Sequence, residues 1–159
     1  MNSILPKKHF KLANFFIEKE SQEYGACRFE INGLLVIGRN AKITSKKIGQ
    51  FVTVWKRDGK GTTQPFDILD KFDFFVINIQ SDDFFGQFVF PKSILIKEGI
   101  ISSNSKNGKR GFRLYPPWDK PKNKQAEKTQ KWQLKYFLSI DDNETIDIKR
   151  AKLLYFGKK

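Results

Sequence analysis

The sequence has few of the residues that build disulfide, zinc and nucleophilic sites, with one cysteine and one histidine among 159 residues. A single cysteine excludes an internal disulfide framework and a cysteine-rich zinc site, and it fits a reducing cytosol. Cys27 lies in a strand pattern, which predicts a buried thiol and not a nucleophile. His9 falls in a predicted helix and is expected at its surface. No catalytic triad is predicted around this one histidine.

Long apolar runs are also lacking. No run approaches the ~20 residues of a membrane span, and the N-terminal residues show neither a long apolar core nor a small-residue cleavage site. We therefore expect no signal peptide, no membrane partner and a cytoplasmic location. No motif indicates a small-molecule substrate or a cofactor.

Acidic residues are scarce, because 17 Asp and Glu stand against 30 Lys and Arg, giving a formal charge of +13 and a pI near 9.8. Such an excess destabilises a compact state by self-repulsion and favours partners of opposite sign. Nucleic acid is the commonest such partner of a small basic domain. An acidic protein partner is the alternative.

What the chain does contain is a real core, with 39% hydrophobic residues and 16 phenylalanines. Its length suits a single domain over residues 1–159. A helix is predicted over residues 6–24, followed by strands over 27–31, 34–37, 41–44, 50–55, 73–79, 85–90 and 111–115. Asn32-Gly33 predicts a hairpin turn, and 56–64 is predicted as a loop. Short helices are expected at 92–97 and around 148–155, and a turn at 141–143. The fold class is α/β or α+β, with a central mixed sheet flanked by helices.

The stretch from Phe112 to Leu138 carries the strongest functional signal in the sequence. An aromatic turn with Pro116-Pro117 precedes a helix capped by Asp119 or Asn123. At ~100° per residue the helix separates two faces. One face is predicted to carry Lys124, Lys128, Lys131 and Lys135, and the other to pack through Ala126, Thr129, Gln133, Tyr136 and Phe137. Four like charges at this spacing repel one another, and a polyanion would relieve that repulsion. A solvated helix face is the alternative interpretation.

Two further basic groups join this lysine row. One group lies on either side of the predicted 50–55 strand. The other, which includes Lys106 and Lys109, comes just before and at the start of the stretch from Phe112 to Leu138. Phosphate binding needs dispersed cations and base stacking needs exposed aromatic faces. Tyr115, Trp118 and Trp132 are the stacking candidates, although aromatic residues at such positions also serve as core. The predicted nucleic-acid-binding residues are Lys42, Lys46, Lys47, Lys56, Arg110, Arg113, Trp118, Lys124, Lys128 and Lys131.

Carboxylates offer an alternative function, a magnesium-dependent nuclease. Such a site needs acids and often a lysine converging on one cation. Many nucleases of the PD-(D/E)XK type place an acid, any residue and a lysine on one strand. Here Lys56 suits the lysine, but Val54 stands at the acid position. The acids that could serve instead are Glu30, Asp67, Asp70 and Asp73, and none has diagnostic spacing. We therefore expect no efficient catalysis, and magnesium only under this alternative.

Several blocks resemble the MepB family, small bacterial proteins of which the founding one is named for its location beside a multidrug efflux pump and its repressor. The resemblance runs from about Tyr24 to Phe137, and its most specific blocks are Arg113-Leu-Tyr-Pro-Pro-Trp118 and Gln130-Lys-Trp-Gln133. It implies a single α/β domain similar in fold to the PD-(D/E)XK nucleases, with nucleic-acid binding suspected. It implies no catalytic residue set, so none is carried over.

Overall fold

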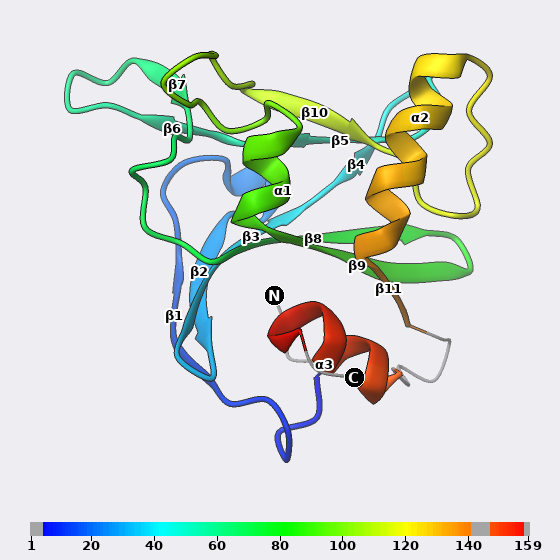
Figure 1. The fold of residues 1–159 in the computed structure, drawn as a ribbon, viewed down its shortest axis with the longest axis horizontal. Coiled ribbons are helices and arrows are strands. Elements are labelled where there is room, and N and C mark those ends of the chain that lie inside the picture. Colours follow the sequence, from blue (N-terminus) through cyan, green and yellow to red (C-terminus); the bar gives the residue numbers. More distant parts are fainter. Residues whose placement is uncertain (1–4, 141–146, 158–159) are drawn as a thin grey trace.

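A six-stranded mixed sheet forms the centre of the molecule (Figure 1). The computed structural model describes residues 5–140 and 147–157; the turn predicted at 141–143 lies outside this range. The strand order is β1-β2-β3-β8-β9-β11, in which β3 and β8 run parallel and all other neighbours are antiparallel. This confirms the predicted mixed-sheet α+β fold. The strands are β1 (Leu12–Ile17), β2 (Cys27–Ile31), β3 (Leu34–Asn40), β8 (Phe74–Ser81), β9 (Phe84–Pro91) and β11 (Phe137–Ile140).

Both faces of this sheet are covered, as the continuous apolar sequence of β8 predicts. Alternate residues of β8 enter two separate cores: Phe75 and Ile77 lie in one, and Phe74 and Val76 in the other. Helix α3 (Ile148–Phe156) covers the second core, where Tyr155 is buried and its hydroxyl donates to Gln87 Oε1 at 3.2 Å. Because both cores draw on the same strands, the sheet holds the layers above and below it in fixed relation.

The other face carries a second, smaller sheet and two helices. This sheet has the order β10-β5-β4, from β10 (Gly111–Leu114), β5 (Gln50–Thr53) and β4 (Lys42–Ile43). Helix α1 (Lys92–Lys97) has the predicted bounds, and α2 (Lys124–Gln133) stands beside the sheet (Figure 1). Among the described residues, no helix is long and apolar enough to cross a membrane.

The predicted loop over 56–64 is instead most of a hairpin. Its strands are β6 (Trp55–Arg57) and β7 (Thr63–Pro65), paired antiparallel. Asp58 closes the turn, since its Oδ1 accepts from the backbone N–H groups of Lys60 and Thr62. The glycines and lysine of the turn indicate a loop on their own, but local side-chain hydrogen bonding by Asp58 makes the turn tight enough for the flanking residues to pair.

The predicted helix over 6–24 is wrong. Residues 12–17 form β1, which pairs with β2, and only Gln22–Tyr24 make a short 3-10 helix, η1. The helical spacing of Phe10, Ala13 and Ile17 does not mark one packed face, since Phe10 is buried whereas Ala13 and Ile17 are exposed. Pairing with the edge of the sheet overrides this weak pattern. His9 accordingly lies in a half-buried turn and not on a helix surface.

Candidate functional site

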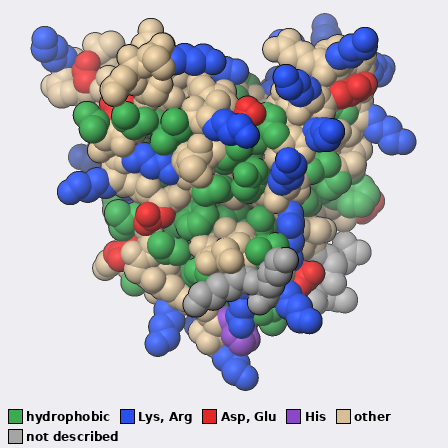
Figure 2. All heavy atoms as spheres, viewed as in Figure 1, with side chains coloured by type: hydrophobic (Ala, Val, Ile, Leu, Met, Phe, Trp, Pro, Cys, Tyr) green, Lys and Arg blue, Asp and Glu red, His purple; other side chains and the backbone are tan. Residues whose placement is uncertain are grey.

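A groove of about 680 Å³ lies between α2, β10 and the segment that follows α1. The segment from Glu98 to Lys109 forms one wall, and α2 forms the other. Figure 2 shows basic side chains on both sides of the hollow between the α2 region and the β6–β7 region, with hydrophobic side chains between them. The residues that line the groove are Glu98, Ile100, Lys106, Lys109, Phe112, Arg113, Tyr115, Asn123, Gln125, Ala126, Lys128, Thr129 and Trp132.

One polar side chain caps helix α2, and another fixes the helix against β10. Asn123 caps the helix, as one of the two predicted alternatives, by accepting from the Ala126 N–H at 2.8 Å. Gln133 is fully buried and bridges to β10: its Oε1 accepts from Tyr115 N at 2.9 Å and its Nε2 donates to Arg113 O at 3.0 Å. A buried amide satisfied by two backbone groups fixes the position of the helix as well as its rotation.

That rotation turns the lysine row outward. Lys124, Lys128, Lys131 and Lys135 are all exposed, while Ala126 and Gln133 are buried on the opposite side. The predicted division of the helix into a packed and a charged face is therefore confirmed. The predicted helix end is wrong, because α2 stops at Gln133 and a 3-10 turn, η2 (Leu134–Tyr136), leads into β11. Phe137 and Leu138 thus reach the core from a strand.

Positive charge dominates the groove. Its lining holds four cationic side chains, Lys106, Lys109, Arg113 and Lys128, against one carboxylate, Glu98. Arg113 is held in place, since its guanidinium donates to the carbonyls of Ile48 and Gly49 and to Thr44 Oγ1. These bonds tie β10 to the turn between β4 and β5. Within the described residues, the side chains of Lys106, Lys109 and Lys128 make no such hydrogen bonds, so the groove combines one fixed cation with three adaptable ones.

Two half-buried aromatic rings, Tyr115 and Trp132, line the same groove. Trp132 packs on Phe90, with ring centroids 5.5 Å apart. Trp118, the predicted stacking residue, does not line the groove. Its ring stacks on Phe84 at 5.1 Å and meets the edge of Phe137 at 5.8 Å. One face of Trp118 is therefore occupied within the protein.

The other predicted binding residues are spread around this groove. Lys124 and Lys131 share the exposed face of α2 with Lys128. β4 and the turn after it carry three exposed lysines, Lys42, Lys46 and Lys47. Lys42 Nζ lies 3.5 Å from Glu23 Oε2. Arg110 donates to Thr63 on the β6–β7 hairpin. The structure thus brings only Arg113 and Lys128 of the predicted set into the groove lining.

The groove also contains residues that the predicted binding set omits. Lys106 and Lys109 belong to the same basic segment as Arg113, so their sequence position already pointed to them. Glu98 and Ile100 carry no such signal, because they reach the groove only through the path of the chain after α1. No local pattern in the sequence reports that path.

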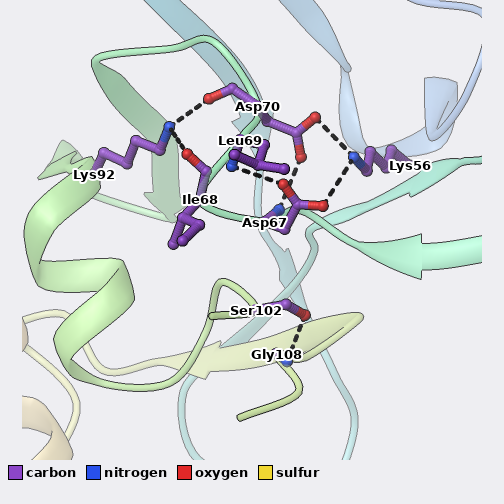
Figure 3. Close-up of polar contacts among 8 residues, drawn as sticks. All are labelled: Lys56, Asp67, Ile68, Leu69, Asp70, Lys92, Ser102 and Gly108. Atoms are coloured by element: carbon purple, nitrogen blue, oxygen red, sulfur yellow. Dashed lines mark hydrogen bonds and ion pairs between the residues drawn. The ribbon is translucent and has the colours of Figure 1, made fainter. Parts of the chain in front are cut away.

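The acids of the nuclease alternative converge only in part (Figure 3). Lys56 Nζ lies 2.7 Å from Asp70 Oδ1 and 3.7 Å from Asp67 Oδ2. Asp70 also accepts from the Asp67 N–H through its other oxygen, and Asp67 accepts from the Leu69 N–H. Lys92 fastens the same loop by donating to the carbonyls of Ile68 and Asp70. Lys56 is therefore committed to two carboxylates.

The remaining two acids lie elsewhere. Asp73 Oδ2 accepts from the Leu35 N–H at 2.8 Å, and Glu30 accepts from the Asn14 side chain. Within residues 5–140 and 147–157, no three His, Cys, Asp or Glu side chains are grouped so that they could hold a metal ion. Val54, at the expected acid position, is buried. Lys56 offsets only one of the two negative charges of Asp67 and Asp70, but the described residues bring no third acid or histidine to this pair, so they do not fit a catalytic magnesium site.

Cys27 offers no nucleophile. Its side chain is buried on β2, and this burial raises the pKa of the thiol above its ordinary value, which leaves it protonated at neutral pH. Two charged groups of the described residues act on this thiol: the buried Arg39, whose guanidinium pKa is lowered by burial, and Glu18, whose Oε2 lies 3.6 Å from Arg39 Nη2. This ion pair joins β3 to the residue after β1, and neither of its members lines the groove.

The model of the MepB-like family matches residues 18–139, which include both sheets, α1, α2 and the groove. The chain belongs to the MepB-like family. No curated protein matches it.

Solved structures agree with this assignment. The crystal structure of MepB is similar with a TM-score of 0.78 and 37% sequence identity, over 80% of this chain and 86% of that chain. A bacterial homing endonuclease is similar over 80% of each chain, with a TM-score of 0.41 and 17% identity. The second likeness is too weak to support an argument. The MepB-like assignment therefore rests on the first structure and on the family model.

Proposed function

We propose that this MepB-like protein binds nucleic acid through the groove between α2 and the Glu98–Lys109 segment. The observation that carries the proposal is the meeting of four cationic side chains and two half-exposed aromatic rings in one concavity. Three of these cations come from a segment before α2 and one from α2 itself. A groove that gathers positive charge from separate elements suits a polyanion better than a merely solvated helix face does.

Binding would divide between two kinds of contact. The lysines neutralise phosphates and release condensed counterions, which gives affinity without regard to sequence. Tyr115 and Trp132, both half-exposed in the groove, offer aromatic surface on which an unstacked base could stack. The exposed lysines of α2 outside the groove, Lys124 and Lys131, extend the same positive surface. Trp118 remains a predicted stacking residue at the far end of the aromatic turn. The proposal includes a cytoplasmic location.

The experiment compares variants that remove the same charge at different places. Lys128→Ala removes a groove cation, whereas Lys149→Ala removes an exposed lysine from α3, on the other face of the sheet. Binding of labelled single-stranded and duplex oligonucleotides should weaken in the first variant and stay near wild type in the second. Equal weakening in both would mean that only net charge matters, and the proposed site would be wrong.

An acidic protein remains the competing partner, because it too would be attracted by the groove. Salt dependence does not separate the two, so heparin serves as a polyanion without bases. Two results together would contradict the proposed nucleic-acid recognition: oligonucleotides that bind no tighter than heparin of matched charge, and Trp118→Ala and Tyr115→Ala variants whose affinity is unchanged. Only attraction to polyanions would then remain.

A nuclease is the second candidate, favoured by the approach of Asp67 and Asp70 to Lys56. We expect no efficient cleavage of DNA or RNA with Mg²⁺ or Mn²⁺, because Val54 stands at the expected acid position and only two of the four candidate acids, Asp67 and Asp70, lie near Lys56. Purified protein should leave labelled DNA and RNA intact. Chelator-sensitive cutting that disappears in Asp70→Asn, and equally in a preparation of Asp67→Asn, would reverse this conclusion and exclude a contaminant.

A further inference from the structure

One carboxylate lies in a groove that otherwise gathers positive charge. Glu98 lines the groove together with Lys106, Lys109, Arg113 and Lys128. It is half-buried, and within residues 5–140 and 147–157 its side chain forms no ion pair and accepts no hydrogen bond. Both carboxylate oxygens are therefore available to accept from a ligand.

The local chain does not account for this carboxylate. Glu98 directly follows α1, and its N–H donates to Ile94 O at 2.9 Å as the helix ends. The carbonyl groups at a helix C-terminus carry partial negative charge, which makes an anion there unfavourable. A carboxylate also repels phosphate and so lowers the affinity of the groove for a polyanion. A group that opposes both the helix end and general phosphate binding suits a role in selecting the ligand.

An ammonium group lies close to this acceptor. Lys106 crosses Gly99, the residue after Glu98, so closely that a Cβ on Gly99 would lie 2.7 Å from Lys106 Nζ. Gly99 takes a φ of 71°, which glycine adopts without strain. This wall of the groove thus presents an acceptor and a donor near each other, and no ion pair joins these two described side chains.

Guanine matches this pair of groups. Its Watson–Crick edge carries two adjacent donors, N1–H and the N2 amino group, beside the acceptor O6. A carboxylate can accept from both donors at once, while an ammonium donates to O6. On the same edge adenine, cytosine and thymine each have a single donor group beside an acceptor, so none of them offers a carboxylate two adjacent donors.

We propose that Glu98 selects guanine in the groove by accepting from N1–H and the N2 amino group of an unpaired guanine, with Lys106 donating to O6. This inference rests on the nucleic-acid binding proposed above and specifies the base that is recognised. The half-exposed rings of Tyr115 and Trp132 line the same groove and offer surface on which that base stacks. The guanine has to be unpaired, because base pairing occupies this edge.

The first test measures the affinity of the protein for short single-stranded thymine oligonucleotides that differ at one central base. A guanine there should raise the affinity about tenfold over thymine. Adenine, which stacks as a purine but lacks the two donors, should raise it far less. Hypoxanthine keeps N1–H and O6 but lacks the N2 amino group, so its affinity should lie between those of guanine and adenine. This comparison changes only the oligonucleotide and leaves the protein intact.

Variants of Glu98 separate base selection from charge. Glu98→Ala and Glu98→Gln both remove a negative charge from the groove, so affinity for the all-thymine oligonucleotide should rise while the preference for guanine is lost. Glu127→Ala is the matched control, since Glu127 is exposed on α2 and does not line the groove. This variant loses the same charge and should keep the preference for guanine.

Two results would overturn guanine selection: wild-type protein that does not distinguish guanine from adenine, and a preference for guanine that persists in both Glu98 variants. The proposed function would still stand in either case, provided that Lys128→Ala weakens binding of the all-thymine oligonucleotide. If Lys128→Ala leaves that binding unchanged, the groove is not the binding site, and guanine selection within it is wrong as well.

Discussion

Phe137 joins the α2 side of the molecule to the central sheet. Its side chain is buried from β11, meets Phe88 edge-on at a centroid distance of 5.0 Å, and packs over Gly86, where a Cβ would overlap its ring. It also supports the ring of Trp118. Gly86 and Phe137 therefore pack closely across neighbouring strands, and this contact fixes the start of β11 after α2 and η2.

Phe137→Ala should lower the free energy of unfolding by about 3–5 kcal/mol, because it removes a buried ring and leaves a cavity that the strand pairing cannot close. Chemical denaturation measures this change. Leu69→Ala is the control, since Leu69 is 85% exposed, and it should change stability by less than ~0.5 kcal/mol. A loss below ~1 kcal/mol for Phe137→Ala would show that the site relaxes and that Phe137 is not a core residue.

For single residues, the sequence predicts the structural role correctly where that role depends on local chain context. Asn123 caps α2 and Cys27 is buried, both as expected. Phe137 was expected in the core for a different reason, as part of the helix face opposite the lysines. Its burial holds, but the strand that buries it was not predicted, because pairing with β9 is a long-range contact.

Helix α2 shows what an amphipathic pattern can establish about an element. The spacing of its lysines predicts their common exposed face, and the structure agrees. The pattern does not reveal the helix end, because Leu134 to Leu138 continue the apolar spacing while the chain passes through η2 into β11. Helix ends decided by tertiary pairing are not encoded in local periodicity.

Replacing Lys124, Lys128 and Lys131 together by alanine should leave α2 folded and its melting temperature level or raised. Alanine has the higher helix propensity, and the change removes repulsion between exposed like charges. Thermal unfolding followed by circular dichroism measures the effect. A large drop in melting temperature would mean that these lysines pair with acids or pack on the protein, and the exposed-face assignment would be wrong.

In β1, unlike in α2, the apolar pattern predicts the wrong type of element. Its apolar residues fit helical and extended periodicity about equally well over so short a stretch, and the choice is made by β2, to which the chain returns through η1. By contrast, the Asn32-Gly33 turn predicts its hairpin correctly, because both residues take the positive φ that this turn requires: 48° and 82°.

For the molecule as a whole, the decisive feature is where distant segments meet. The groove draws on Glu98, on the Lys106–Tyr115 region and on α2, which the small sheet and Gln133 hold together. Composition predicts that a basic surface exists, but not that its members meet in one concavity. The same holds for the acids: only the fold shows that Asp67 and Asp70 share Lys56 while Asp73 and Glu30 lie apart.

The central claim is that the groove binds nucleic acid through phosphate contacts, and the salt dependence of affinity tests it most directly. The logarithm of the binding constant should fall linearly with the logarithm of salt concentration, by about 0.9 per phosphate contact on duplex and about 0.7 on single strands. Lys128→Ala should reduce this slope by about one unit for every sequence, Lys149→Ala should leave it unchanged, and Tyr115→Ala, which removes an aromatic ring from the groove, should weaken binding by ~1–3 kcal/mol with the slope preserved. A wild-type affinity that does not vary with salt, or a slope that Lys128→Ala leaves unchanged, would contradict the account.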